Sequence, residues 1–181
     1  RAHAAGRPLL GFGWHHAPQT DWDERHGTGQ AYFTFVYSAN VAEVEVDLET
    51  GQVEVMRVVA AHDVGRAISP AMVRNQIYGG VAMGCGYGLW EEHRLTGGVP
   101  RTLNLNTYLL PTAMDAPEVD AIIVENPDPA GPFGAKSVGE PATEITAPAV
   151  VNAIAHATSR RVRELPADLE AVLLGHHLRA D

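Results

Sequence analysis

The residues with the clearest chemical potential lie in one short stretch, GPFGAKSVGEP, at positions 131–141. Its charged side chains are Lys136 and Glu140, and the small residues around them leave the backbone accessible. A loop of small residues that leads into a helix can present several backbone N–H groups to an anionic ligand, and a lysine adds a charge-assisted contact. A carboxylate that is partly desolvated against such a ligand can serve as a base near neutral pH. The stretch therefore predicts an anion-binding loop with Glu140 beside it.

Glu140 also has a purely structural alternative. An acid in the first turn of a helix stabilises the helix dipole, which here requires a helix that begins at Pro141. Thr146 is the stronger start signal, because Thr is a favoured N-cap residue and Pro148 is tolerated in a first turn. We therefore expect the helix to begin at Ala147 and Glu140 to lie in the loop before it.

Two familiar nucleotide-binding motifs do not fit this sequence. The phosphate-binding loop of nucleoside triphosphatases needs a glycine directly before its lysine, and Ala135 stands at that position. GCGYG, at positions 84–88, matches a dinucleotide fingerprint only in its glycine content, because it lies inside a helical pattern instead of between a strand and a helix.

The helical segment that contains GCGYG is unusually rich in glycine. Ser69 followed by Pro70 predicts its start, and five glycines lie between positions 79 and 88. Each glycine costs about 1 kcal/mol relative to alanine in a helix interior, so we expect a neighbouring backbone or a large cofactor to approach this helix closely. Gln76, on the face that carries Gly80, is either a solvated helical position or a hydrogen-bond partner of whatever the glycines admit.

The overall charge argues against nucleic acid as a partner. The 181 residues carry a formal net charge of -9, and the 13 basic residues are scattered along the chain. Neutralising phosphates needs clustered Lys and Arg. Lys136 is the only lysine among those basic residues, which suggests a position where a compact ammonium is wanted instead of a guanidinium, although chance is an equal explanation.

Metal ligands, disulfides and membrane spans find no support. The nine histidines include the adjacent pairs His15-His16 and His176-His177, which point in different directions on regular structure, and we expect surface histidines. His62-Asp63 ends a predicted strand and can form a satisfied core pair. Cys85 stands alone, and no apolar run is long enough to cross a bilayer, so the expected setting is cytoplasmic.

The remaining pattern predicts an α+β layered domain. Alternation over 41–46 and a second apolar run over 53–64, joined by LETGQ, predict a hairpin. VDAIIVEN, at 119–126, predicts a third strand, and Gly175 can end a C-terminal helix. We expect residues 1–30 to be an irregular segment and residues 31–181 to form the domain, with the order hairpin, helix, strand, helix.

These motifs together resemble the xanthine dehydrogenase and aldehyde oxidase family of molybdenum hydroxylases. GAKSVGEPATEITAPAVVNAI is similar to the last signature of that family, in which a G-x-K-x-x-G-E-P segment carries the catalytic glutamate. Three further segments agree in the same order: VAEVEVDLETGQVEV, AAHDVGRAISPAMVRNQIYGGVAMGCGYGLWEE and RELPADLEAVL. The resemblance runs from about Gly29 onward, and HHAPQTDWDE looks more like the bacterial xanthine dehydrogenase molybdenum subunits than the vertebrate enzymes.

The resemblance implies a role for each matching residue. Glu140 is similar to the family's general base, and Gln76 to the glutamine that contacts the pterin cofactor. The residues that match the loop against that cofactor are Lys136, Ser137, Val138 and Gly139. The implied activity is hydroxylation of an electron-poor carbon in a purine or related heterocycle, with water as the oxygen source and Glu140 as the base.

The resemblance also implies cofactors and partners. The cofactor is molybdopterin with molybdenum, in the cytosine dinucleotide form, and 2Fe-2S and FAD centres are expected on partner domains or subunits. The chain lacks the upstream half of the usual molybdenum subunit and starts at Arg1 instead of Met. We therefore expect a cut domain or one subunit of a split enzyme that needs the remainder of the molybdenum subunit. The alternative is a non-catalytic binding or assembly module of the same fold.

Overall fold

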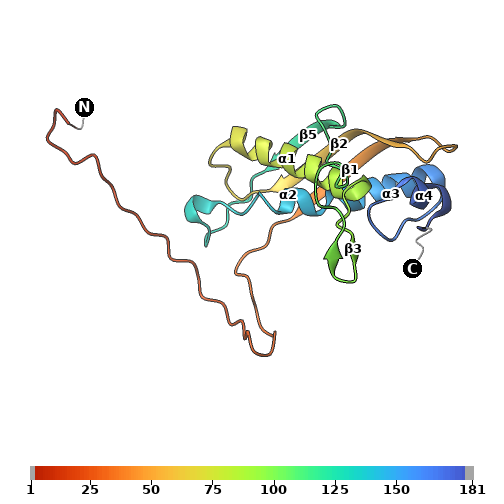
Figure 1. The fold of residues 1–181 in the computed structure, drawn as a ribbon. Coiled ribbons are helices and arrows are strands. Elements are labelled where there is room, and N and C mark those ends of the chain that lie inside the picture. Colours follow the sequence, from red (N-terminus) through yellow and green to blue (C-terminus); the bar gives the residue numbers. More distant parts are fainter. Residues whose placement is uncertain (1–2, 178–181) are drawn as a thin grey trace.

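A three-stranded sheet with helices on one face forms the centre of the molecule (Figure 1). The computed structural model describes residues 3–177. β1 (Ser38–Val46) and β2 (Val53–Asp63) pair antiparallel, and β5 (Glu118–Val124) pairs parallel to the other side of β2. This arrangement confirms the predicted α+β class, the hairpin and the third strand.

The register of the sheet directs one set of side chains toward the helices. The rows of facing residues are Ala42–Val58–Val119, Asn40–Ala60–Ala121 and Ser38–His62–Ile123. Because side chains alternate along a strand, the residues between these rows point to the other face. Val41 is 68% exposed there, as the alternating pattern of its segment predicts. The core therefore lies between one face of the sheet and the helices.

Two helices cover that face. α1 (Pro70–Leu89) packs against β2 and β5, and α3 (Thr146–Thr158) packs mainly against β1. The fully buried side chains between them include Val58, Ile77, Val81, Val150 and Ile154. The short helix α2 (Pro141–Glu144) precedes α3 and lies along α1. The sheet, α1 and the α2–α3 unit therefore share one apolar core.

Local signals set the turns and helix ends. Asp47 accepts hydrogen bonds from the N–H groups of Glu49 and Thr50 at 2.8 and 3.1 Å, and Gly51 adopts φ +78°, which closes the β1–β2 hairpin. α1 begins at Pro70 as predicted. The C-terminal helix α4 (Leu169–Leu174) begins after Asp168, whose carboxylate accepts from the N–H of Ala171. Gly175 ends it with φ +81°, which confirms that predicted stop.

Two extensions leave this core (Figure 1). Residues 3–37 run away from the sheet as a long irregular segment, along which Leu10, Phe12 and Trp14 are 87%, 92% and 81% exposed. The small hairpin of β3 (Leu95–Thr96) and β4 (Val99–Pro100) projects from the end of α1.

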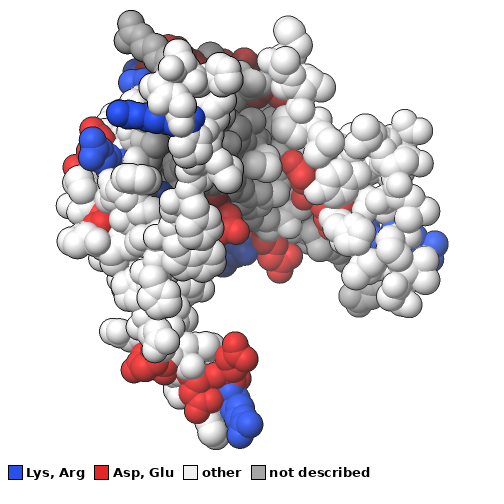
Figure 2. All heavy atoms as spheres, turned by 90° about the vertical axis from the view of Figure 1, so that its left-hand side faces the viewer, with Lys and Arg blue, Asp and Glu red and all other residues white. Residues whose placement is uncertain are grey.

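The face of the molecule shown in Figure 2 carries scattered Lys and Arg side chains and no concentrated basic patch. Within residues 3–177, no helix combines the length and apolarity that a bilayer span requires.

Candidate functional site

The loop before Glu140 is fastened to the end of β2 by backbone hydrogen bonds. The N–H of Lys136 donates to the carbonyl of Val64 at 2.9 Å, and the N–H of Arg66 donates to the carbonyl of Gly134 at 2.8 Å. Gly65 lies between these bonds with φ +63°, and a Cβ there would come within 2.8 Å of the Lys136 nitrogen. Only a glycine permits this approach. Residues 64–66, just after β2, therefore hold residues 134–136 in place.

A buried ion pair completes this attachment. Lys136 Nζ lies 2.6 Å from Asp63 Oδ2, and the two side chains are 5% and 7% exposed. Asp63 Oδ1 also accepts from the N–H of Gly65 at 3.0 Å. Burial raises the pKa of Asp63, but the Lys136 ammonium and the Gly65 N–H outweigh it, so the pKa lies below its ordinary value. The ammonium that the sequence suggested for an anionic ligand has an internal partner here.

The glycines of α1 admit a neighbouring backbone. A Cβ on Gly80 would lie 2.6 Å from the Ala142 carbonyl carbon, and one on Gly84 would lie 2.5 Å from Thr146 Cβ. A Cβ on Gly88 would lie 3.2 Å from Ala147 Cβ. Of the two causes that the sequence left open for these glycines, the structure shows the close approach of α2 and α3.

Gln76 lies on the same face of α1 as Gly80, Gly84 and Gly88. Residues four apart share one face of a helix, so Gln76 lies one turn before Gly80. A Cβ on Gly139 would lie 3.5 Å from Gln76 Oε1, in ordinary contact. Segment 139–147 therefore follows the row of α1 residues from Gln76 onward, and both Gln76 and Gly139 are exposed. The structure brings together two expected site residues from distant parts of the chain.

The segment between Lys136 and Glu140 differs from its anchored ends in its backbone hydrogen bonding. Within residues 3–177, the N–H groups of Ser137, Val138 and Gly139 donate to no other residue. Val138 turns its side chain toward the core, whereas Ser137 and Gly139 are exposed. Successive unpaired N–H groups on a fixed loop can bind an anionic or strongly polar ligand. The structure leaves these N–H groups without a partner among the described residues, and the binding of a ligand there stays a prediction.

Glu140 stands at the start of a helix, contrary to our expectation. α2 begins at Pro141, and the carbonyl of Glu140 accepts from the N–H of Thr143 at 2.9 Å. The predicted helix is α3, which begins at Thr146, one residue before the predicted Ala147. The predicted cap is wrong, because the N-cap residue is Ile145, and Thr146 is buried with its Oγ1 accepting from Asn40 Nδ2 at 2.9 Å. The short helix α2 before it was not predicted. The Glu140 side chain is exposed and caps no N–H group. Its carboxylate is therefore available to a ligand on the same surface.

Two histidines also differ from expectation. His62 is fully buried, and neither ring nitrogen has a hydrogen-bond partner within the described residues, so it does not form a satisfied pair with Asp63. Burial lowers the pKa of His62 and favours the neutral ring. His177, expected at the surface, has a side chain that is 4% exposed and lies 3.1 Å from Asp168 Oδ2. Residues 3–177 contain no group of three or more potential metal ligands.

The only signal in the sequence for Asp63 was its position at the end of a predicted strand. Its lysine partner lies 73 residues away along the chain. Strand periodicity carries no information about such a distant contact, so sequence reasoning did not identify Asp63 as part of this site.

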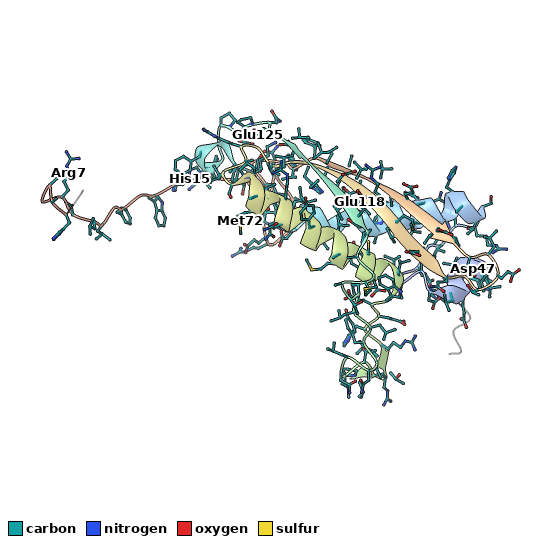
Figure 3. All side chains as sticks on the ribbon, turned by 90° about the horizontal axis from the view of Figure 1, so that it is seen from above. Arg7, His15, Asp47, Met72, Glu118 and Glu125 are labelled. Atoms are coloured by element: carbon teal, nitrogen blue, oxygen red, sulfur yellow. The ribbon has the colours of Figure 1, made fainter. Side chains whose placement is uncertain are left out.

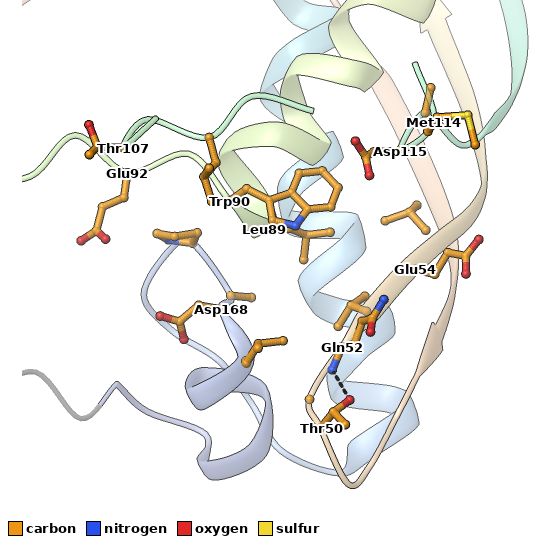
Figure 4. A pocket seen from close by; sticks show the side chains of 18 of the residues that line it. Thr50, Gln52, Glu54, Leu89, Trp90, Glu92, Thr107, Met114, Asp115 and Asp168 are labelled. Atoms are coloured by element: carbon orange, nitrogen blue, oxygen red, sulfur yellow. Dashed lines mark hydrogen bonds between the residues drawn. The ribbon is translucent and has the colours of Figure 1, made fainter. Parts of the chain in front are cut away.

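A cavity of about 770 Å³ lies elsewhere, around Trp90 and the hairpin turn (Figure 4). It is lined by Gln52, Leu89 and Asp168 among others, and by none of the expected site residues. Figure 3 labels Met72 near the start of α1 and Asp47 at the hairpin tip, at opposite ends of the sheet. Helix rise places Leu89 roughly 20 Å from Gln76, so the cavity is separate from the Glu140 surface.

Comparison of the sequence with known proteins shows the family to which this chain belongs. Residues 1–117 match a family model described as molybdopterin cofactor-binding domain. The chain is similar to a probable xanthine dehydrogenase subunit of Bacillus subtilis, with 37% identity over 142 residues, covering 78% of this chain and 19% of that protein. It is also similar to the aldehyde oxidoreductase of Megalodesulfovibrio gigas, with 35% identity over 174 residues, covering 94% of this chain and 19% of that protein.

A solved structure agrees with these sequence matches. The aldehyde oxidoreductase from Desulfovibrio desulfuricans superimposes with a TM-score of 0.79 at 30% identity, over 95% of this chain and 19% of that chain. The present chain thus spans about a fifth of the length of these relatives.

Proposed function

The chain belongs to the family of molybdopterin cofactor-binding domains, and from this we propose that it forms the cofactor-binding and base-supplying part of a xanthine dehydrogenase-like molybdenum hydroxylase. The reaction is the oxidative hydroxylation of an electron-poor carbon of a purine or related heterocycle, with oxygen from water. Glu140 is the base. The observation that carries the proposal is the exposed Glu140, directly after three backbone N–H groups that have no partner among the residues that the structure describes.

The residues on this surface fit a pterin cofactor. The N–H groups of Ser137, Val138 and Gly139 are donors with no partner within residues 3–177, and a pterin with its phosphate groups offers many acceptors. Gln76 adds an exposed side-chain amide beside Gly139. Amides donate and accept, so Gln76 can pair with either kind of edge on a heterocycle. The ammonium of Lys136 pairs with Asp63 and does not face the cofactor. Lys136 therefore acts by holding the start of the loop in place.

Glu140 is placed to move one proton. The molybdenum cofactor, when bound, supplies the oxidising centre that accepts two electrons from the substrate. The Glu140 carboxylate accepts the proton from the hydroxyl that becomes the new oxygen of the product, which makes that oxygen a stronger nucleophile. Loss of water around the Glu140 carboxylate, once a cofactor and a substrate were bound beside it, would strengthen it as a base.

The proposal extends to the rest of the assembly. This chain spans about a fifth of the length of its relatives and does not enclose a substrate by itself. The remainder of the molybdenum subunit therefore completes the site. We place the cofactor in its cytosine dinucleotide form, and the electrons leave through 2Fe-2S and FAD centres on partner domains or subunits.

Replacing Glu140 by Gln in the natural enzyme that contains this chain tests the base. The amide has the same shape and cannot accept the proton, so turnover should fall by at least about a hundredfold, the lower range of general-base effects. Molybdenum and pterin content should stay unchanged. Glu144→Gln is the matched control, because Glu144 is an exposed acid in the same short helix. Full activity in Glu140→Gln would refute the base role and favour a non-catalytic cofactor-binding module.

The substrate class needs a separate assay. We expect the enzyme to oxidise hypoxanthine or xanthine with a higher kcat/KM than simple aldehydes. The basis is the similarity to the probable xanthine dehydrogenase of Bacillus subtilis, although an aldehyde oxidoreductase is comparably similar. Preference for aldehydes would contradict the purine assignment and leave the base assignment intact.

A further inference from the structure

We propose that Asp63 is a positioning residue that, through its buried ion pair with Lys136, fixes the loop from Lys136 to Glu140 in its ligand-binding shape. The inference rests on the proposed function for its effect on turnover, and on the geometry alone for its effect on the loop. Asp63 ends β2, and Lys136 begins the exposed segment that leads to Glu140. The side chain of Asp63 is buried and contacts the loop through the ammonium of Lys136.

The contacts around the pair form a cross-link with several independent bonds. Asp63 Oδ2 receives the ammonium at 2.6 Å, and Asp63 Oδ1 receives the N–H of Gly65 at 3.0 Å. The backbone of Lys136 bonds to Val64 at 2.9 Å. One carboxylate therefore holds both the strand end and the loop that crosses it. A salt bridge that is 5% and 7% exposed is shielded from the solvent screening that weakens surface pairs.

The exposed loop is short and fixed at both of its ends. At its start, Lys136 is held by Asp63 and Val64. At its end, Glu140 begins α2, and Ala142 packs against Gly80 of α1. Between these ends lie only residues 137–139, whose N–H groups bond to no residue in the described part of the chain. The shape of this segment depends on its anchors, because it has no hydrogen bonds of its own.

A preformed loop matters for the proposed reaction. Donors and bases act efficiently when the protein holds them in place before the ligand arrives. Gly134 precedes the anchor at Lys136 and Gly139 ends the segment, and both glycines allow many backbone conformations once an anchor is lost. The buried pair therefore restricts a segment that its sequence would otherwise leave free. Lys136 supplies the compact ammonium that pairs with Asp63. This internal ion pair, instead of contact with a ligand, accounts for the use of the chain's only lysine at this position.

Asp63→Asn in the natural enzyme that contains this chain tests the inference. The amide keeps an acceptor for Gly65 and removes the charge that pairs with Lys136. We expect the backbone N–H groups of Lys136 and Arg66 to exchange with solvent deuterium at least about tenfold faster, because opening of the cross-link exposes them. We also expect kcat per bound molybdenum to fall about tenfold or more, with KM changed less. A purely stabilising role would leave kcat unchanged in the folded, molybdenum-loaded fraction.

Three further variants make the result decisive. Asp120→Asn is the control, since it removes an aspartate from the exposed Arg57–Asp120 pair on the same sheet and should change neither measurement. Lys136→Arg retains the charge but replaces the ammonium by a larger guanidinium, and it should reproduce both effects if Asp63→Asn fails to fold. Asp63→Asn combined with Lys136→Gln restores an uncharged hydrogen bond and should recover at least part of the exchange protection.

The outcomes separate this inference from the proposed function. Unchanged exchange at Lys136 and Arg66, or unchanged kcat per molybdenum, in a folded Asp63→Asn or Lys136→Arg enzyme overturns the positioning role. Glu140→Gln is measured in parallel. If Glu140→Gln remains active while Asp63→Asn shows faster exchange and reduced kcat, the base role fails and the cross-link still positions the loop.

Discussion

The close packing of α1 against α2 predicts opposite effects for alanine at two adjacent glycines. Alanine is favoured over glycine in a helix by about 1 kcal/mol. At Gly79 a Cβ meets no atom within 4 Å, so Gly79→Ala should stabilise the fold by up to that amount. At Gly80 a Cβ would meet Ala142 backbone atoms at 2.6 and 2.8 Å, distances at which something must move.

The cost at Gly80 follows from the kind of atom that is in the way. Overpacking a core costs about 1–3 kcal/mol, and the upper end applies here because backbone cannot rotate aside as a flexible side chain can. After the helix-propensity gain, Gly80→Ala should lose about 2 kcal/mol. The two variants should therefore differ by about 3 kcal/mol.

Urea unfolding followed by far-UV circular dichroism measures this difference, with the m-value as a check that the transition remains cooperative. In thermal unfolding, Gly80→Ala should lower Tm by roughly 4–8 °C and Gly79→Ala should raise it by roughly 2–4 °C. Equal stability of the two variants would refute the packing of α2 on this face of α1. It would leave the glycines to be explained by a cofactor.

The remaining predictions concern buried titratable groups. Burial raises the pKa of Cys85 to about 11, so the native thiol should resist alkylation at about pH 8 and react only after unfolding, as mass spectrometry can show; rapid native labelling would contradict its burial. His62 has a folded pKa below its ordinary 6.5, so its contribution to stability is complete above that pH and is lost as pH falls through the folded value. His62→Leu should therefore flatten the loss of stability as pH falls below about 6.5, and an unchanged slope would show that His62 binds protons equally in the folded and the unfolded protein. Asp63 also has a lowered pKa, so its contribution is complete above 3.8 and is lost as pH falls through its folded value, and Asp63→Asn should remove this part of the acid transition in urea titrations.

Patterns that depend on neighbouring residues were predictable. The alternation in β1, the Pro70 start of α1 and the Gly175 stop of α4 reflect local backbone geometry, and all three are present in the structure. The short helix α2 was not predicted, and the N-cap predicted for α3 was wrong, although α3 begins within one residue of the expected position. Thr146 has the chemistry of an N-cap, but tertiary packing uses its hydroxyl to accept a bond from Asn40 of β1. A buried long-range contact thus overrode a local preference.

The sequence by itself identified the family and predicted the roles of the loop and of Glu140, because these inferences depend on residue types at short, fixed spacings. Only the tertiary structure decided which way Lys136 points and what the glycines of α1 meet. Both answers lie in segments far apart along the chain, since Asp63 precedes Lys136 by 73 residues and Ala142 follows Gly80 by a similar span. The direction of a side chain depends on the charge and space available to it once the chain has folded, and short-range periodicity contains neither.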